Sequence, residues 1–300
     1  MSDLVISAPA PLAQQSGHGA LGKSGTPQGK VLAVTSGKGG VGKTFFSANL
    51  AAALAKRGQS VVVLDADLGL ANLDVVLNLH PKVTLHDVFS GKAGLQQAIT
   101  PAPGGFSAIL AGSGMVEYSR LNADTREEFK RVVTALSLHF DVVLLDTGAG
   151  ISDGVLFTIS LANQVLVVAT PEPTSLTDAY ATIKVLATQQ GRKEVRLVVN
   201  QTARVGDGRA ITTQLQQVLD RFVVNPQAGA PGRLAAPGSA PPKPGGPAMK
   251  LVHLGDIPGD PAVRQAVMRR QLLMQTTPGC PASLALAQIA GKIEETILQA

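Results

Sequence analysis

Apolar residues recur along this chain in short, nearly continuous runs that are separated by stretches with helical periodicity. These runs cover residues 31–36, 61–67, 106–110, 140–147, 164–170, 194–200 and 250–254. Because Val, Leu and Ile fill them without regular polar alternation, they are typical of strands buried on both faces of a parallel sheet. The alternation of strands and helices predicts a doubly wound α/β fold, with a mostly parallel sheet and helices on both faces.

The stretches between the strands predict helices of ordinary length. They are expected at about 44–57, 124–138, 175–190 and 209–222, and from about 283 to the end of the chain. Gly58 suits the C′ position of the first helix, and Asp124 is expected to cap the N-terminus of the second. We expect short helical turns within loops over residues 68–104, and a loop leading into a helix over 254–267.

Two stretches lack this pattern. Residues 1–29 are rich in Gly, Ser, Ala and Pro, and we expect a disordered tail or a short recruitment segment there. A flexible insertion is predicted at 225–249, since residues 225–248 hold seven of the chain's 19 prolines, five glycines and no acidic residue. The predicted organisation is one domain over residues 30–300 with this insertion inside it, either as a tolerated surface loop or as a docking segment for a partner.

Composition narrows the classes of function. The formal net charge is +5, of which residues 1–30 contribute +1 and residues 225–250 contribute +3, so about +1 is left for the rest of the chain. This charge is too small for a dedicated DNA-binding surface, although it leaves room for a local basic patch, so direct DNA binding is not expected. Aromatic residues make up 3% of the sequence and Trp is absent, which leaves little material for stacking on single-stranded nucleic acid. Cys280 is the only cysteine, which excludes an intrachain disulfide. We find no secretory signal and no long apolar segment, and therefore expect a soluble cytoplasmic protein.

A glycine-rich loop follows the first predicted strand and precedes the first predicted helix. Its sequence, SGKGGVGKT, contains the spacing G-x-x-x-x-G-K-[ST] of the phosphate-binding P-loop. Glycines let consecutive backbone N–H groups converge on phosphate oxygens, and the helix that follows directs its positive end at the same anion. Lys43 can reach the β- and γ-phosphates, and the Thr44 hydroxyl can bind Mg²⁺. The nucleotide-binding loop is expected to comprise Gly37, Lys38, Gly39, Gly40, Val41, Gly42, Lys43 and Thr44.

Aspartates follow two of the predicted strands. Asp146 comes after the run VVLL, at the Walker-B position that holds Mg²⁺ through water, and Asp65 and Asp67 come after VVVL. In doubly wound sheets, ligands bind at the carboxyl ends of the strands, where these carboxylates are expected. An alternative makes one of Asp65 and Asp67 a helix cap.

The base of the nucleotide is predicted to be adenine. A P-loop GTPase is expected to carry a guanine-binding N-K-x-D motif after a late strand, but here Asn200 is followed by Gln-Thr-Ala. The side-chain amide of Asn200 has the donors and the acceptor needed to read the edge of a purine.

The loop SGKGGVGKT resembles the deviant Walker A motif of the MinD/ParA class of P-loop ATPases. The stretches LDADLGLANLDVVLNL (64–79), LDTGAGIS (145–152) and TPEPTSLTDAYATIKVL (170–186) are similar to the flagellar-number regulators called FlhG, FleN or YlxH. The stretches IPGDPAVRQAVMRRQ (257–271) and CPAS (280–283) extend the likeness, which covers about residues 30–224 and 250–290.

The resemblance implies an ATPase that forms a homodimer with ATP. Lys38 of each subunit is implied to reach across the interface to the partner's phosphates. Lys43 is assigned to the β- and γ-phosphates, while Thr44 and, through water, Asp146 are assigned to Mg²⁺. Asp67 is implied to position the attacking water.

Other positions matched by the resemblance surround these groups. Asp65 is implied to support the segment that senses the γ-phosphate. Asn200 and the loop from Pro258 to Asp260 are implied to flank the adenine.

The flagellar relatives imply a switch that regulates flagellar number, placement and biosynthesis, through the flagellar SRP-type GTPase FlhF, flagellar switch proteins or a flagellar transcriptional activator. Two departures bear on this. The D-Q-A-x-x-L-R-like motif by which some relatives stimulate FlhF is not found, and residues 12–15 offer only LAQQ. The basic amphipathic C-terminal extension that anchors MinD to membranes is not found either, which leaves open a polar or peripheral location at the inner face of the membrane.

Other functions share the same loop. A MinD/ParA-type spatial regulator of cell division, chromosome partition or other polar cargo is the main alternative. Nucleotide binding that regulates a partner without turnover is another. A reductase like the nitrogenase iron protein is excluded, because that enzyme bridges an iron–sulfur cluster with two cysteines from each subunit and this chain has one.

Overall fold

The computed structural model describes residues 28–69, 71–112, 122–224 and 249–299. The strands are β1 (Lys30–Ser36), β2 (Val61–Ala66), β3 (Thr100–Pro101), β4 (Ser107–Ile109), β5 (Val142–Ala149), β6 (Gln164–Ala169), β7 (Glu194–Thr202) and β8 (Lys250–Pro258). The helices are α1 (Lys43–Lys56), α2 (Leu73–Leu77), α3 (Leu85–Phe89), α4 (Leu95–Ala98), α6 (Ala123–Ser137), α7 (Asp153–Ser160), α8 (Pro173–Gln190), α9 (Asp207–Leu219), α10 (Pro261–Met268), α11 (Leu273–Thr276) and α12 (Pro281–Ile293). Two π-helical turns, η1 (Asp220–Val224) and η3 (Glu294–Leu298), continue α9 and α12.

Nearly all of the predicted tail and of the predicted insertion lies outside these residues. The LAQQ segment at 12–15 lies outside them as well.

The described strands form one sheet in the order β3-β4-β2-β5-β1-β6-β7-β8. Every neighbouring pair is parallel except β3 and β4. β1 lies between β5 and β6, so the chain builds the sheet on one side of β1 before it crosses to the other. Such a reversal opens a crevice at the carboxyl ends of the central strands. The arrangement confirms the predicted fold class.

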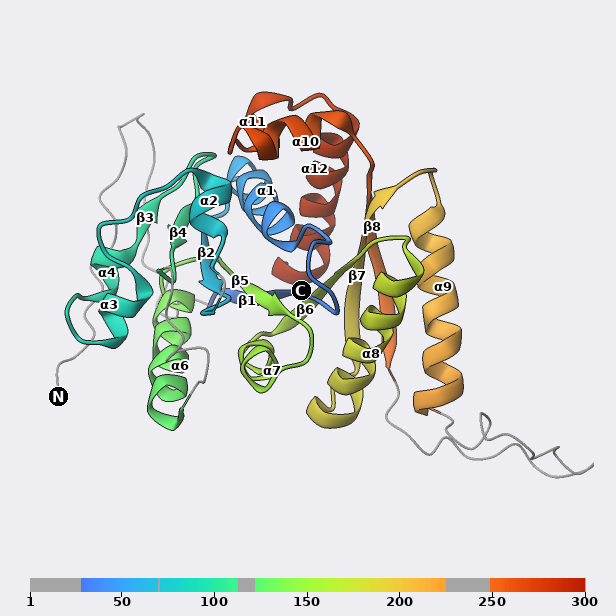
Figure 1. Ribbon diagram of the computed structural model, residues 1–300, viewed down its shortest axis with the longest axis horizontal. Helices are drawn as coiled ribbons and strands as arrows, with labels where there is room; N and C mark the ends of the chain where they lie inside the picture. The colour runs from blue at the N-terminus through green and yellow to red at the C-terminus, as the bar shows by residue number, and fades with distance from the viewer. Residues whose placement is uncertain (1–27, 70, 113–121, 225–248, 300) are drawn as a thin grey trace, which may run out of the picture.

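Each face of the sheet carries its own core. On β1, Val31 and Ala33 belong to one cluster and Leu32 and Val34 to the other, because successive side chains of a strand point to opposite faces. The first cluster includes side chains of α6, α7, α8 and α9, and the second includes those of α1 and α12. Figure 1 shows α1 and α12 on one side of the sheet and α6, α7 and α8 on the other. Burial on both faces explains why the strands read as continuous apolar runs.

The prediction that Asp124 caps its helix is wrong. Asn122 is the N-cap of α6, and its side-chain oxygen accepts a hydrogen bond from the N–H of Thr125 at 2.8 Å. Asp124 lies in the first turn instead, where its charge interacts favourably with the helix dipole. Both residue types suit a helix start, and the bond from Asn122 decides the register.

The predicted loop after residue 254 is also partly wrong, since β8 continues to Pro258. A register shift at Leu254 lets Gly255, Asp256 and Ile257 resume pairing with β7. The Gly-Asp pair suggests a turn in the sequence, but a bulge absorbs one residue and the ladder goes on.

The remaining expectations differ mainly at element ends. Short helices α2, α3 and α4 occupy the region 68–104 as predicted, together with the two-residue strand β3. The last helix packs on α1 and β8 as its apolar face indicated, and begins at Pro281. Helix α7 was not predicted, although Ser152 accepts a bond from the N–H of Val155 in the manner of an N-cap.

Candidate functional site

The loop between β1 and α1 forms an open cradle of backbone amides. Gly40 and Gly42 have φ values of 79° and 96°, which glycine adopts without strain. A Cβ on Gly37 would lie 2.2 Å from the carbonyl oxygen of Asp178, whereas the space beside Gly39 and Gly40 is open. Gly42 is the N-cap of α1, and no described side chain caps that end. The first N–H groups of α1 therefore face the open space, where an anion fits.

Asp65 and Asp146 lie side by side behind this cradle. They are register partners on β2 and β5 and are 1% and 3% exposed. The Ser47 hydroxyl donates to Asp146 Oδ1 at 2.9 Å, and the Thr44 hydroxyl also hydrogen-bonds to this carboxylate. Burial raises the pKa of Asp146 to about 6, although both hydroxyls and the charge of Lys43 act in the opposite direction.

The charge balance of the site favours a bound cation. Burial lowers the pKa of Lys43, while Asp146 and Asp67 act to raise it. Burial, followed by the charge of Asp146, raises the pKa of Asp65 well above its ordinary value. One lysine thus faces three carboxylates. A hard divalent cation with oxygen ligands relieves this repulsion, so the residues fit Mg²⁺, with Thr44 and Asp146 as the groups that would hold it.

Asp65 joins the end of β2 to the start of α2. Its two carboxylate oxygens accept hydrogen bonds from the N–H of Asp67 at 3.3 Å and from the N–H of Leu73, the first residue of α2, at 3.2 Å. The capping alternative therefore describes part of its role. Asp67 lies over the end of β5, because a Cβ on Gly148 would be 3.4 Å from the Asp67 carboxylate.

Lys38 points away from the cavity that its own loop builds. Its Nζ lies 3.0 Å from Glu172 Oε2 and 3.0 Å from Thr174 Oγ1, both at the start of α8. The side chains of Lys38 and Glu172 are 37% and 64% exposed. Lys38 is thus the one cation of the loop that is directed at the surface.

The cavity beside the cradle has a volume of about 1060 Å³ and brings most of the predicted residues together. It is lined by Gly39, Gly40, Gly42, Lys43, Thr44, Asp65, Asp67, Asp146, Asn200, Pro258 and Asp260. Gly37, Lys38 and Val41 do not line it. Residues from five separate stretches of the chain therefore meet at the carboxyl ends of the strands.

The far wall of the cavity contains the residues assigned to adenine. Asn200 Nδ2 donates to the carbonyl of Val41 at 2.8 Å, so this amide also braces the nucleotide-binding loop. Asp260 is the N-cap of α10 and accepts bonds from the N–H groups of Ala262 and Ala282. Its carboxylate therefore ties α10 to α12.

Sequence reasoning missed two parts of the site. Ser47, three residues after Thr44 on α1, shares the Asp146 carboxylate, and only its helical spacing from Thr44 could have indicated this. Val263, Val267 and Met268 of α10 add an apolar side to the cavity. The apolar periodicity after Pro261 could have indicated this helix, but nothing in the sequence shows that it packs beside the nucleotide-binding loop.

No helix within the described part of the chain has the length and apolar character needed to cross a membrane.

Comparison with known proteins agrees with this geometry. The chain is 38% identical to the antiactivator FleN of Pseudomonas aeruginosa over 90% of its own length and 88% of FleN. It is 33% identical to the flagellum site-determining protein YlxH of Helicobacter pylori, over 87% of this chain and 81% of YlxH. Septum site-determining MinD of Thermotoga maritima is 40% identical, over 53% of this chain and 58% of MinD.

Solved structures and a family model indicate the same fold and family. The cell division ATPase MinD of Pyrococcus furiosus superposes with a TM-score of 0.69 at 26% identity, covering 89% of this chain and 99% of that one. MinD of Pyrococcus horikoshii, solved with Mg-ADP, has the same fold, with a TM-score of 0.68 over 89% of this chain and 96% of that one. Residues 32–225 match the model of the CobQ/CobB/MinD/ParA nucleotide binding domain. The chain thus belongs to the CobQ/CobB/MinD/ParA family of nucleotide-binding proteins.

Proposed function

We propose that this chain is an ATP-dependent dimerising switch that regulates flagellar number, placement and biosynthesis. The observation that carries the proposal is the direction of Lys38, which lies in the nucleotide-binding loop yet outside the cavity of that loop. A lysine so placed does not line the phosphate cavity of its own subunit and is free to serve the phosphates of another. The flagellar part is supported by the likeness to FleN and YlxH, which extends over 90% and 87% of this chain.

The residues that line the cavity supply the groups that hydrolysis requires. Bound ATP supplies the γ-phosphoryl group, and Mg²⁺ offsets the negative charge that develops on its transfer to water. The amides from Gly39 to Gly42 and the ammonium of Lys43 bind the phosphates. Thr44 would hold the metal directly, and Asp146 would hold it through water. Asp67 orients the attacking water.

Asp65 connects this chemistry to the neighbouring segment. Its bonds to the N–H groups of Asp67 and Leu73 fix the start of α2 relative to the end of β2. A change in the charge near Asp67 is therefore expected to shift the position of α2. At the other end of the cavity, Asn200 and the loop from Pro258 to Asp260 flank the adenine.

Dimerisation requires Lys38 to leave Glu172 and Thr174. Both members of this ion pair are more than one-third exposed, and such pairs contribute about 0–1 kcal/mol. Release is thus inexpensive compared with the charge-assisted contacts that Lys38 gains at the partner's phosphates. Hydrolysis then occurs in a shared site and is expected to be slow and stimulated by dimerisation.

Substitution of Lys38 tests the dimer. Sedimentation should give a monomer without nucleotide and a dimer with ATP, and Lys38→Ala should remain a monomer under both conditions. Lys184→Ala, at an exposed position of α8, is the matched control and should behave as the parent chain. Asp67→Ala should form a dimer that persists, because hydrolysis is slowed. A Lys38→Ala chain that dimerises as well as the parent would contradict the trans role.

The flagellar role has its own test. Partners are expected among the flagellar SRP-type GTPase FlhF, flagellar switch proteins and a flagellar transcriptional activator, at the pole or the inner face of the membrane. Deletion of the gene should change the number or position of flagella, and unchanged flagella would contradict the proposed flagellar role. The MinD-type alternative is less supported, because likeness to MinD of Thermotoga maritima covers 53% of this chain.

A further inference from the structure

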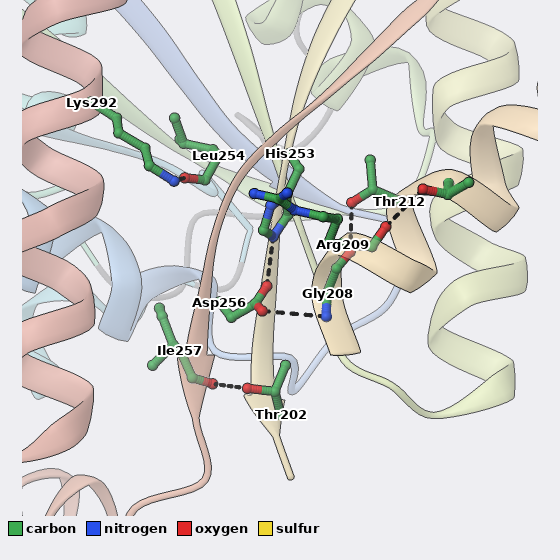
Figure 2. Close-up of polar contacts among 10 residues, drawn as sticks. Thr202, Gly208, Arg209, Thr212, His253, Leu254, Asp256, Ile257 and Lys292 are labelled. Carbon is green, nitrogen blue, oxygen red and sulfur yellow. Dashed lines mark hydrogen bonds and ion pairs between the residues drawn. The ribbon is translucent and has the colours of Figure 1, made fainter. Parts of the chain in front are cut away.

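A second cavity lies beside the open edge of β8 and has a volume of about 640 Å³. We call it the β8-edge cleft. Its floor is β8 around His253 and Asp256, one wall is the β7–α9 turn with the first turn of α9, and the other wall is α12. Figure 2 shows β8 running between α9 and α12, with His253 and Asp256 directed at α9 and Lys292 reaching β8 from α12.

The acidic group in the cleft is already paired. Asp256 Oδ1 lies 2.6 Å from His253 Nε2, and Asp256 Oδ2 accepts a hydrogen bond from the N–H of Gly208 at 3.3 Å. Asp256 is the only acidic residue among the described residues that line the cleft. Its charge is therefore directed at its own neighbours and not at an incoming ligand.

The cations in the cleft lack such pairing. Arg204 and Arg209 lie on the α9 wall, and neither forms an ion pair with another residue of the described ranges. In Figure 2, Arg209 extends from α9 toward the strand that carries His253. Lys292 Nζ donates to the carbonyl of Leu254 at 2.8 Å, an acceptor without net charge. The cleft thus presents three positively charged side chains, none of which forms an ion pair within the described residues.

The opposite wall is largely apolar. α12 contributes Pro281, Leu284, Ala285 and Ile289, and Leu284 is 52% exposed. Val205, in the β7–α9 turn, is fully exposed at the mouth. Exposed apolar residues beside unpaired cations form an amphipathic surface with one charged side and one apolar side.

The free edge of β8 is closed to strand addition at this point. The register shift at Leu254 disturbs the ladder, and the Leu254 carbonyl is occupied by Lys292. A bulge and a lysine placed at the edge are among the devices that protect sheet edges from pairing with another strand. A ligand of the cleft must therefore be held by side chains.

We propose that the β8-edge cleft binds an acidic segment of a partner protein, in which Asp or Glu side chains alternate with apolar ones. Carboxylates would pair with Arg204, Arg209 and Lys292, while apolar side chains pack on Leu284 and its neighbours. A free phosphate would leave the apolar wall unused. Nucleic acid needs a broad basic surface, and the body of this chain has a charge of about +1.

The cleft is separate from the nucleotide cavity. Among the described residues, Pro258 alone lines both. Arg204 and Arg209 do not touch the nucleotide cavity, so their substitution leaves ATP binding and hydrolysis intact. Failure of this inference is thereby distinguishable from failure of the proposed function.

Selection from a display library of random short peptides tests the inference on the full chain with Mg-ATP. Enriched peptides should be rich in Asp and Glu interleaved with Leu, Ile, Val or Phe. Arg209→Glu and Arg204→Glu should each weaken the best peptide about tenfold or more by fluorescence anisotropy, a loss of about 1.4 kcal/mol. Arg221→Glu, beyond the far end of α9, is the matched control and should bind as the parent chain does.

The other outcomes overturn the proposal. One is the enrichment of peptides that are not acidic, or of none. Another is peptide binding that Arg209→Glu and Arg204→Glu leave unchanged. A third is competition by inorganic phosphate or by duplex DNA that displaces the peptide at low concentration, which would assign the cleft to phosphate groups.

Discussion

The nucleotide cavity and the β8-edge cleft are neighbours that hold charge in opposite ways. In the nucleotide cavity, carboxylates and Lys43 are packed at the ends of buried strands, and burial shifts the pKa values of Lys43, Asp65 and Asp146. In the cleft, Arg204 and Arg209 remain exposed to solvent. Buried charges that await a ligand lower the stability of the free protein, whereas solvated charges do not.

Function and stability are therefore expected to conflict in the nucleotide cavity and not in the cleft. Substitutions in the nucleotide cavity should change the chemistry and the stability together, and in opposite directions at the carboxylates. Substitutions in the cleft should change partner binding with little effect on stability. Substitutions in the two regions test this contrast, and Lys43→Ala is expected to have the largest effect and Lys292→Met the smallest.

Lys43→Ala should give the largest effect. Removal of the cation that we propose contacts the transferred phosphoryl group is expected to lower the hydrolysis rate about 10²- to 10³-fold, the usual loss for one preorganised electrostatic donor. Peptide binding at the cleft should be unchanged. Arg209→Glu should have the opposite profile, with a normal rate of ATP hydrolysis and a lower affinity for the peptide. If either variant affected both activities, the two sites would not be independent.

Asp146→Asn should stabilise the ligand-free fold while removing Mg²⁺-dependent hydrolysis. The pKa of Asp146 is raised from 3.8 to about 6, so the folded state binds the proton more tightly and the parent chain loses stability as the pH rises between these values. Above that window the buried carboxylate costs about 3 kcal/mol, and the neutral amide avoids this cost. Urea unfolding in EDTA should show the variant more stable at about pH 8 and similar at about pH 4.

Asp256→Asn makes the same substitution in the cleft and can be compared directly with Asp146→Asn. There the carboxylate is paired with His253 and the N–H of Gly208, so removal of its charge should destabilise the fold by about 0.5–1.5 kcal/mol. Equal signs for Asp146→Asn and Asp256→Asn would refute the distinction between a carboxylate that awaits a cation and one that already has a partner.

The same contrast explains how much the sequence could predict. The loop from Gly37 to Thr44 is a run of consecutive residues whose backbone makes the site, so its spacing alone identifies it. Asp65 and Asp146 could be placed together because both end apolar strands, and parallel strands end at one edge. Asn200 could be assigned to the purine from its place after a late strand, but its bond to the Val41 carbonyl was not foreseen.

The cleft could not be predicted in this way. Arg209, His253 and Lys292 come from three elements that no local spacing connects, and His253 meets Asp256 only because β8 continues past the bulge at Leu254. The sequence indicated a loop at that point. Sites made of consecutive backbone groups are visible in a single sequence, whereas sites made of dispersed exposed side chains depend on packing that the sequence does not display.

Asn200→Ala should destabilise the fold by about 1–2 kcal/mol, because the buried carbonyl of Val41 loses its donor. Affinity for ATP and for ADP should fall together as the nucleotide-binding loop loosens. Competition between ATP and GTP adds a second measurement. If Asn200 also reads the purine edge, the preference for ATP should fall in the same variant, and an unchanged preference would leave Asn200 as a brace only.

Lys292→Met removes the comparable side-chain-to-backbone bond in the cleft and should have the smallest effect on stability. Lys292 Nζ also donates to a backbone carbonyl, that of Leu254, at the same length of 2.8 Å as the bond from Asn200 to Val41. Lys292 is exposed, so water can replace it, and we expect a loss below about 0.5 kcal/mol in urea unfolding. The freed carbonyl lies on an open sheet edge, so concentration-dependent association should be measured as well. A loss as large as that of Asn200→Ala would show that burial does not separate the two regions, and that the edge of β8 is held by Lys292 itself.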